Sequence, residues 1–412
     1  MLGIKTAALP ASLRRTNQRT VISLLSRMGS ASRADLAKAA GISQPTAGKI
    51  TAELLAMGVL QSVATTVVED PPAAAGNHTP RLGRPGRMLE LDRRKPRFVA
   101  IELDVAETRV AALPVGVQPA DRWDHSFPTP SSPAALGEQL AQVASRIPIT
   151  DLWGVLVSVP GIVDEAAGRV LFSPNLHWLE GTPPGPLIQR AWNIPVVLVQ
   201  EIRALALGHL AAEPGGEDFL LVDFGHGVGG AVVMEGQLYP HPTPLNGEIG
   251  HTPVPANLRP CGCGGKGCLE TLISRRGLCQ SFAAARGGSR RGGGSASDWS
   301  RLVAHVHEHG LEPWLEETLE TAAKVVAGAI NVLGLHHVVL TGTLTEFPES
   351  AFARLGEGIQ RGALWARFGK VTCQAAPRRR SSGLVAVGVD RLVLPAVEDQ
   401  PAARTAERAT AA

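Results

Sequence analysis

Residues 246–270 read NGEIGHTPVPANLRPCGCGGKGCLE, and this stretch holds three of the five cysteines of the 412-residue chain. Cys261, Cys263 and Cys268 fall within eight positions, and His251 precedes the first of them by ten residues. Three thiolates and one imidazole suit a closed tetrahedral Zn²⁺ site. The glycines between the cysteines let a short loop turn back, so that the three sulfurs face one point. The sequence therefore predicts one Zn²⁺ bound by these four side chains.

Two carboxylates flank the predicted zinc site, Glu248 before it and Glu270 after it. Acids beside metal ligands favour a pocket that the metal shapes. Two plainer interpretations stay open at this point. One is a structural zinc knuckle that binds no ligand, since structural sites are the commoner cysteine-rich kind. The other is a set of cysteines that are buried without any metal.

The motif GEIGH followed by CGCGGKGCLE resembles the signature of the ROK family, which is named for repressors, open reading frames and kinases. The resemblance extends from about Thr16 to Val397. It implies an α/β actin-like (ribonuclease H-like) domain of two lobes with a cleft between them. It also implies that His251 touches a sugar as well as zinc, and that Glu248 and Glu270 hydrogen-bond sugar hydroxyls.

The composition of the chain argues against several other classes of protein. The formal charge of +3 gives no global basic field, so contact with nucleic acid must come from a local patch. Five cysteines, three of them in one cluster, do not form a disulfide framework, which favours a reducing compartment. We find neither a signal-peptide pattern nor about 18 uninterrupted apolar residues. The expected location is the cytoplasm.

The first 92 residues carry the signals of a winged helix-turn-helix domain. Apolar residues recur at helical spacing from Asn17 to Met28, whereas residues 1–15 are expected to be mobile. Ser32 to Asp35 predicts a capping box that opens a second helix, and Ser43 caps a third. In the third helix Gln44, Thr46 and Lys49 face outward and are the candidate DNA-reading residues. The alternative is an ordinary three-helix packing module.

Strand-like runs at 59–62 and 88–91 would supply the wing, separated by a long connection over about 64–86 that is expected to be mobile. The connection ends in RLGRPGR, which resembles the wing of ROK repressors. Arg84 in that element is the candidate minor-groove contact. The alternative is a solvated linker. The predicted domains are therefore residues 1–92, a ROK sugar-binding domain at 93–399, and a disordered tail at 400–412.

Beyond Arg97, strands alternate with helices, which favours an α/β fold. The segments that resemble phosphate-binding loops are altered. The first reads Asp104-Val105-Ala106-Glu107-Thr108, where ROK kinases have Asp-x-Gly-Gly-Thr, so two side chains block close backbone approach and Glu107 is expected to face the triphosphate. The second, residues 225–230, keeps four glycines but has His226 in place of threonine. A glycine-rich hairpin turn is its alternative interpretation.

The catalytic pair of ROK kinases, Asn-Asp, corresponds to Gln200-Glu201, and each residue is one methylene longer. A displacement near 1 Å costs on the order of 10²-fold in rate. Gln200 and Glu201 are therefore expected to bind sugar without catalysis, together with Asn175 in a Ser-Pro-Asn element. A simpler interpretation of Gln200-Glu201 is a helix N-terminus, where an acid favours the dipole.

Three functions remain after these observations. The first is a sugar-responsive, DNA-binding transcription regulator, acting as a repressor of carbohydrate metabolism genes with no enzyme activity. Its partners would be an operator DNA, a sugar or sugar-phosphate effector and further copies of itself, as a homodimer or homotetramer. The second is an ATP-dependent sugar kinase with an appended DNA-binding domain. The third is a regulator whose pocket has lost its ligand.

Overall fold

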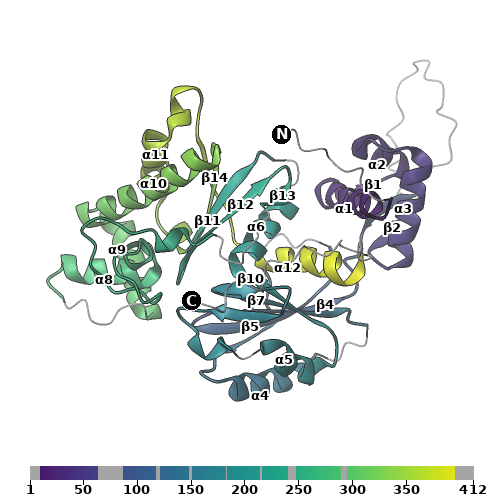
Figure 1. The fold of residues 1–412 in the computed structure, drawn as a ribbon, viewed down its shortest axis with the longest axis horizontal. Helices are drawn as coiled ribbons and strands as arrows, with labels where there is room; N and C mark the ends of the chain where they lie inside the picture. Colours follow the sequence, from purple (N-terminus) through teal and green to yellow (C-terminus); the bar gives the residue numbers. More distant parts are fainter. Residues whose placement is uncertain are drawn as a thin grey trace, which may run out of the picture. The chain divides into compact units, whose positions relative to one another are not determined.

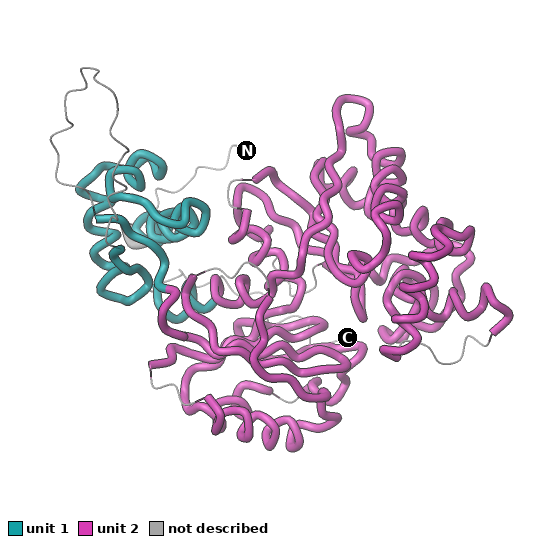
Figure 2. Tube along the Cα trace, turned by 180° about the vertical axis from the view of Figure 1, so that it is seen from behind, with its two compact units in different colours: residues 1–92, 388–412 teal, residues 93–387 magenta. Residues whose placement is uncertain are grey.

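The computed structural model describes residues 10–63, 87–116, 121–147, 151–181, 183–213, 216–239, 247–288 and 295–394. Arg84, the connection at 64–86 and the predicted tail at 400–412 lie outside the described residues. Two compact units divide the chain, one of residues 1–92 with 388–412 and the other of residues 93–387 (Figure 2). The first unit therefore includes the last helical residues, whereas the sequence predicts that they belong to the sugar-binding domain.

In its described N-terminal residues, unit 1 has three α-helices and a small antiparallel sheet. The helices are α1 (Pro10–Met28), α2 (Arg33–Ala40) and α3 (Gln44–Ala56), and the strands are β1 (Ser30–Ala31), β2 (Leu60–Val63) and β3 (Met88–Leu91), in the order β1-β3-β2. The side chain of Ser32 accepts from the Asp35 N–H and completes the predicted capping box, and Ser43 caps α3 in the same way.

Helix α1 begins at Pro10, several residues before the predicted start at Asn17. Its first turns are held by ion pairs that the local sequence does not reveal. Arg14 pairs with Glu53 of α3 at 2.9 Å, and Arg19 pairs with Asp390 at 2.6 Å. Asp390 belongs to the π-helical turn Val389–Val393, so these contacts also explain why the end of the chain belongs to unit 1.

Unit 2 has two lobes, each built on a five-stranded sheet. The first sheet has the order β10-β7-β4-β5-β6, with β4 (Phe98–Leu103), β5 (Glu107–Leu113), β6 (His125–Pro128), β7 (Gly154–Val159) and β10 (Val196–Gln200). The pairs β10–β7 and β7–β4 are parallel and the others antiparallel. Helices α4 (Pro133–Ala144) and α5 (Pro184–Trp192) lie on one side of this sheet (Figure 1). Their apolar side chains join those of the strands in one buried core. A separate hairpin joins β8 (Ile162–Asp164) to β9 (Arg169–Phe172).

The second sheet has the order β13-β12-β11-β14-β15, with β11 (Phe219–Phe224), β12 (Val228–Met234), β13 (Gln237–Leu238), β14 (His337–Gly342) and β15 (Thr372–Ala375). Helix α6 (Glu201–Ala212) packs through a small core of its own that includes Leu205, Leu221 and Val339. The larger core belongs to α7 (Glu270–Ile273), α8 (Arg275–Ala285), α9 (Ala296–His309), α10 (Pro313–Leu333) and α11 (Glu349–Gly362).

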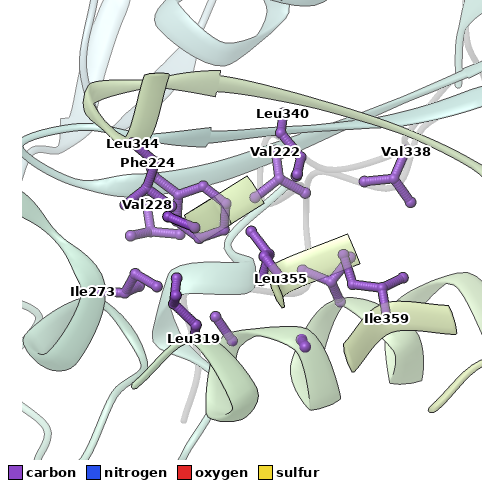
Figure 3. Close-up of a cluster of buried hydrophobic side chains, with 14 of the residues drawn as sticks. Val222, Phe224, Val228, Ile273, Leu319, Val338, Leu340, Leu344, Leu355 and Ile359 are labelled. Atoms are coloured by element: carbon purple, nitrogen blue, oxygen red, sulfur yellow. The ribbon is translucent and has the colours of Figure 1, made fainter. Parts of the chain in front are cut away.

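Alternate residues of one sheet point to different cores, as the two-residue period of a strand requires. Val222 and Phe224 of β11 face Leu319 of α10 and Leu355 of α11 (Figure 3), whereas Leu221, the residue before Val222, belongs to the α6 core. The strands are therefore covered on both faces, which explains their continuous apolar sequence. The last helix, α12 (Arg380–Gly388), follows β15, and its N-terminal residues reach the first lobe through Asp121 and Glu102.

None of the helices that the structure describes has the length and apolar composition needed to cross a membrane.

Candidate functional site

The four predicted metal ligands converge. One ligand atom from each of His251, Cys261, Cys263 and Cys268 lies within 4.8 Å of all the others. The Cys263 and Cys268 sulfurs are 3.7 Å apart, and the Cys261 sulfur is 3.5 Å from His251 Nδ1. With Zn–S near 2.3 Å and Zn–N near 2.1 Å, the edges of a tetrahedron are about 3.8 and 3.6 Å. Two of the six edges thus match those of a tetrahedral cation site, and the remaining ligand atoms lie within 4.8 Å of one another.

Short backbone hydrogen bonds build this cluster. The Cys261 N–H donates to Gly265 O and the Gly264 N–H to Cys261 O, which closes a tight turn around Cys263. Gly267 has φ +79°, and a Cβ there would lie 2.4 Å from Asn257 O, so only glycine fits. Burial raises the pKa of the Cys261 thiol to about 12. That thiol therefore stays protonated unless a bound cation displaces the proton.

His251 connects the cluster to the cleft between the lobes. Its Nδ1 faces the cysteines, while its Nε2 lies 3.7 Å from the Glu248 carboxylate. Glu248 and His251 both line the cleft. Glu248 directly precedes the 3₁₀ turn Ile249–His251, and His251 ends it. Burial raises the pKa of Glu248, and the nearby charge of Glu270 acts in the same direction.

Glu270 lies at the start of α7, two residues after the last cysteine of the cluster, and lines the same cleft. One of its oxygens accepts a hydrogen bond from the Val228 N–H at 3.0 Å. This bond ties Glu270 to the glycine-rich turn between β11 and β12. Burial raises the pKa of Glu270. Its orientation therefore depends both on the metal loop and on the turn.

The weaker sugar-binding candidates also line this cleft. Asn175 follows β9, and Gln200 ends β10, so both come from the first lobe, opposite Glu248 and Glu270. The Gln200 amide lies 3.5 Å from the Glu248 carboxylate. The sequence-based grouping of these side chains around one cleft agrees with their positions in the structure.

Glu201 occupies the first position of α6, as the helix-start interpretation required, and it also lines the cleft. Its carboxylate forms an ion pair with Arg380, whose guanidinium also pairs with Glu102. Burial, followed by the charges of Asp104 and Asp223, raises the pKa of Glu201. The residue at the position of the kinase base is therefore bound inside a buried charge cluster.

One further ion pair and one hydrogen-bonded pair occupy the other half of the cleft, and sequence reasoning missed both. Arg378 donates two hydrogen bonds to Asp223, at 2.8 and 2.7 Å, and its guanidinium lies so close to Gly225 that a Cβ there would be 2.3 Å away. His226 Nδ1 lies 3.1 Å from Asp104 Oδ1 and links the two lobes. The run Arg378-Arg379-Arg380 was the available signal, but a basic run usually indicates an exposed surface.

One expectation about the phosphate loops is wrong. Glu107 does not face the cleft, because its carboxylate accepts a hydrogen bond from Arg109 of the same strand at 3.0 Å. The cleft is lined instead by the preceding Asp104 and Val105. The negative charge on this side of the cleft comes from Asp104. Burial by itself would raise the pKa of Asp104, but the hydrogen bond with His226 and nearby positive charges lower that pKa overall.

The candidate DNA-reading residues lie on α3. Its inner stripe, Ala47, Ile50 and Leu54, is buried, whereas Gln44 and Lys49 are exposed. Thr46 is half-buried, and its hydroxyl hydrogen-bonds that of Ser43 at 2.8 Å. Gln44 and Lys49 are therefore available to a partner molecule, and Thr46 is held by the helix cap.

Two kinds of known protein, a repressor and a kinase, resemble this chain in sequence. The xylose repressor of Caldicellulosiruptor bescii is 28% identical over 230 residues, 52% of this chain, so the match spans little more than half (56%) of the repressor. The N-acetylmannosamine kinase of Escherichia coli is 28% identical over 250 residues, which cover 60% of this chain and 84% of the kinase.

Among solved structures, a ROK family transcriptional regulator, a homologue of the Escherichia coli MLC protein, superposes with a TM-score of 0.69 at 19% identity. It covers 92% of this chain and 97% of its own. A ROK family glucokinase from Streptomyces griseus, solved with glucose and AMPPNP, has a TM-score of 0.58 at 19% identity and covers 71% of this chain and 97% of its own. Identities this low show the fold alone. The ROK family model matches residues 99–390, and the chain therefore belongs to the ROK family.

Proposed function

We propose that this protein is a DNA-binding transcription regulator that responds to a sugar and does not phosphorylate it. One observation carries the proposal. The ROK domain, in which the glutamate at the kinase-base position is paired with a buried arginine, is joined to a separate unit of three helices and a small sheet. The similarity to a xylose repressor and to a regulator that covers nearly the whole chain supports it.

Unit 1 has the elements that a winged helix-turn-helix requires, with α3 as the recognition helix. Charge supports this assignment. Residues 1–92 contain 11 lysines and arginines against 6 acids, so the positive charge of the chain is concentrated there. Gln44, Thr46 and Lys49 are the proposed base contacts, and Arg84 the proposed minor-groove contact.

The sugar site is the half of the cleft that the metal cluster supports. Glu248 and Glu270 supply acceptors on one side, where His251 would donate through Nε2, and Gln200 and Asn175 supply amides on the other. Converging polar groups of this kind fix the orientation of a hydroxyl-rich ligand. Zn²⁺ held by His251 and the three cysteines would fix the loop that presents both glutamates, a purely structural contribution.

Phosphoryl transfer needs a free base and room for phosphates beside backbone N–H groups. Here Glu201 pairs with Arg380, and the glycine-rich turn is occupied by the Arg378 guanidinium. The His226–Asp104 pair bridges the lobes at the same place. These contacts support binding without catalysis.

The second candidate is a sugar kinase, and the 84% coverage of N-acetylmannosamine kinase favours it. One experiment separates the two functions and the regulator without a ligand. A panel of sugars is screened by thermal shift, and each sugar that stabilises the protein is tested for ATP-dependent phosphate transfer and for an effect on operator binding. A turnover of roughly 1–100 s⁻¹, the usual range of kinases, would reject the regulator proposal and identify the protein as a sugar kinase. If none of the sugars stabilises the protein, the result would favour the regulator whose pocket has lost its ligand.

A further inference from the structure

Glu165 lies in the turn of the hairpin that joins β8 to β9, in the first lobe of unit 2. It does not line the cleft, whereas Asn175, which follows the same hairpin, does. The side chain of Glu165 is only 11% exposed. A carboxylate that is largely withdrawn from water must find its partners within the protein, so these partners indicate what Glu165 does.

One carboxylate oxygen of Glu165 accepts two hydrogen bonds from the junction of β10 and α6. The Gln200 N–H donates to it at 2.9 Å and the Arg203 Nε at 3.0 Å. Gln200 is the N-cap residue of α6, and its own side chain forms no cap hydrogen bond. In a capping box the third helical residue reaches back to the N-cap N–H. That residue here is the cation Arg203, so Glu165 supplies the acceptor from 35 positions away.

A cap that comes from another element leaves the Gln200 side chain directed to the cleft. The Gln200 residue is only 4% exposed, and its amide lies 3.5 Å from the carboxylate of Glu248 in the other lobe. The negative charge of Glu165 beside the N-terminus of α6 also favours the helix dipole. Glu165 therefore fixes the backbone from which the Gln200 amide reaches the cleft.

The other end of the hairpin is fixed as well. Ser173, the residue after β9, donates from Oγ to Pro160 O at 3.0 Å and from its N–H to Glu180 at 2.9 Å. These bonds hold the segment from which Asn175 enters the cleft. Because one hairpin has Asn175 beside its base and Glu165 in its turn, it links the two amides that the first lobe presents.

We propose that Glu165 is a positioning residue of the sugar site, which acts through Gln200 and does not contact the sugar itself. The inference rests on the proposed function, because it requires a sugar in the cleft. Groups that bind a ligand must be held within about 0.5 Å of the productive geometry by residues behind them. Loss of Glu165 should therefore lower sugar affinity, and should do so only while the Gln200 side chain is present.

The test measures sugar binding to the full-length protein by isothermal titration calorimetry, with D-glucose, D-xylose and N-acetyl-D-mannosamine as probes. For each probe that binds wild type, Glu165→Ala should weaken binding about 3- to 10-fold, the effect of losing one neutral hydrogen bond. Glu165→Gln keeps an oxygen acceptor and should lose less. Arg169→Ala, which changes a side chain of the same hairpin that is 61% exposed, is the matched control and should bind as wild type does.

The double variant separates positioning from general support of the fold. If Glu165 acts through the Gln200 amide, Glu165→Ala should add nothing to the loss caused by Gln200→Ala, whereas a merely structural role gives losses that add. Hydrogen exchange follows the same contact without sugar. The peptide that contains Gln200 should exchange faster in Glu165→Ala than in wild type, because the N–H has lost its acceptor.

Full sugar affinity in Glu165→Ala, or additive losses in the double variant, would overturn the inference and leave the proposed function standing. If none of the three probes binds wild type, the sugar-site role of Glu165 is rejected together with the response to these sugars. Faster exchange in Glu165→Ala would then identify Glu165 as a helix cap alone.

Discussion

Arg380 is one of the largest fully buried side chains in the described chain, with 1% of its surface exposed. Removing a charge from water costs several kcal/mol, and the opposite charges of Glu102 and Glu201 offset that cost only while they stay close. The same contacts hold the Glu201 carboxylate away from the role of a base. One buried arginine thus contributes both to the stability of the lobe junction and to the proposed loss of catalysis.

Replacing Arg380 by methionine should be strongly destabilising, because it leaves the buried Glu102 carboxylate, 1% exposed, with only the partly exposed Arg109 as a charged partner at 3.3 Å. Breaking a buried pair in this way costs about 3–5 kcal/mol. Urea unfolding of Arg380→Met should show this loss, and Glu102→Gln combined with Arg380→Met should recover part of it. If Arg380→Met were as stable as wild type, the Arg380–Glu102 ion pair would have to be hydrated and would contribute little to stability.

The cysteine cluster gives a second prediction about single side chains. Wild type washed with a weak chelator should retain about one zinc per chain, as a closed tetrahedral site does. Cys263→Ser should lose that zinc and unfold at a lower temperature, because metal binding energy adds to folding energy. Cys373→Ser, a half-buried cysteine outside the cluster, is the matched control and should keep its zinc.

Elemental analysis and thermal unfolding of the three proteins check this prediction. Zinc-free wild type with an intact sugar response would contradict it.

Among the helices and strands, those with strong local signals could be predicted from the sequence. Ser32 and Ser43 mark the starts of α2 and α3, and the Gln200-Glu201 junction marks the change from β10 to α6. In each case the deciding contact lies within a few residues. The convergence of His251 with the three cysteines could be predicted for the same reason, since a short glycine-rich loop can bring these side chains together.

Features that depend on distant partners were missed. The start of α1 is held by Glu53 and Asp390, and the two-residue strand β1 exists only because Ala31 pairs with Leu89. Likewise nothing local indicates that Arg378 meets Asp223, 155 positions away. Tertiary ion pairs of this kind carry no sequence period, so only the folded chain reveals them.

Helix α3 carries the prediction about DNA. Lys49 is exposed on the face opposite the buried stripe of α3, so Lys49→Ala should leave folding intact and weaken binding to the operator by roughly 1–3 kcal/mol if it makes a base contact. Lys38→Ala on α2, where Lys38 is also exposed, is the matched control and should cost less. Electrophoretic shift titrations at one fixed salt concentration compare them, because salt alone changes such affinities strongly.

Equal losses in the two variants would indicate general electrostatic attraction in place of base reading by α3.

For the molecule as a whole, the proposal requires that sugar binding in unit 2 change DNA binding by unit 1. A ligand shifts such an equilibrium only by its difference in affinity for the two states. The cleft is suited to this, because residues of both lobes line it and the His226–Asp104 pair joins them directly. A sugar held between Glu270 and Gln200 would therefore favour one arrangement of the lobes over others.

Glu270→Gln tests this coupling with little change in shape. The glutamine oxygen can still accept from the Val228 N–H, but the amide then presents donors to the sugar where the carboxylate presented an acceptor. Losing a hydrogen bond to a charged group costs about 1.5–3 kcal/mol, so sugar affinity should fall roughly 10- to 150-fold. Operator affinity without sugar should stay at the wild-type value, and the effect of sugar on it should disappear at concentrations that saturate wild type. Glu235→Gln, an exposed change in the turn after β12, should behave as wild type in both assays. A Glu270→Gln protein whose operator binding still responds normally to sugar would place the effector outside this cleft.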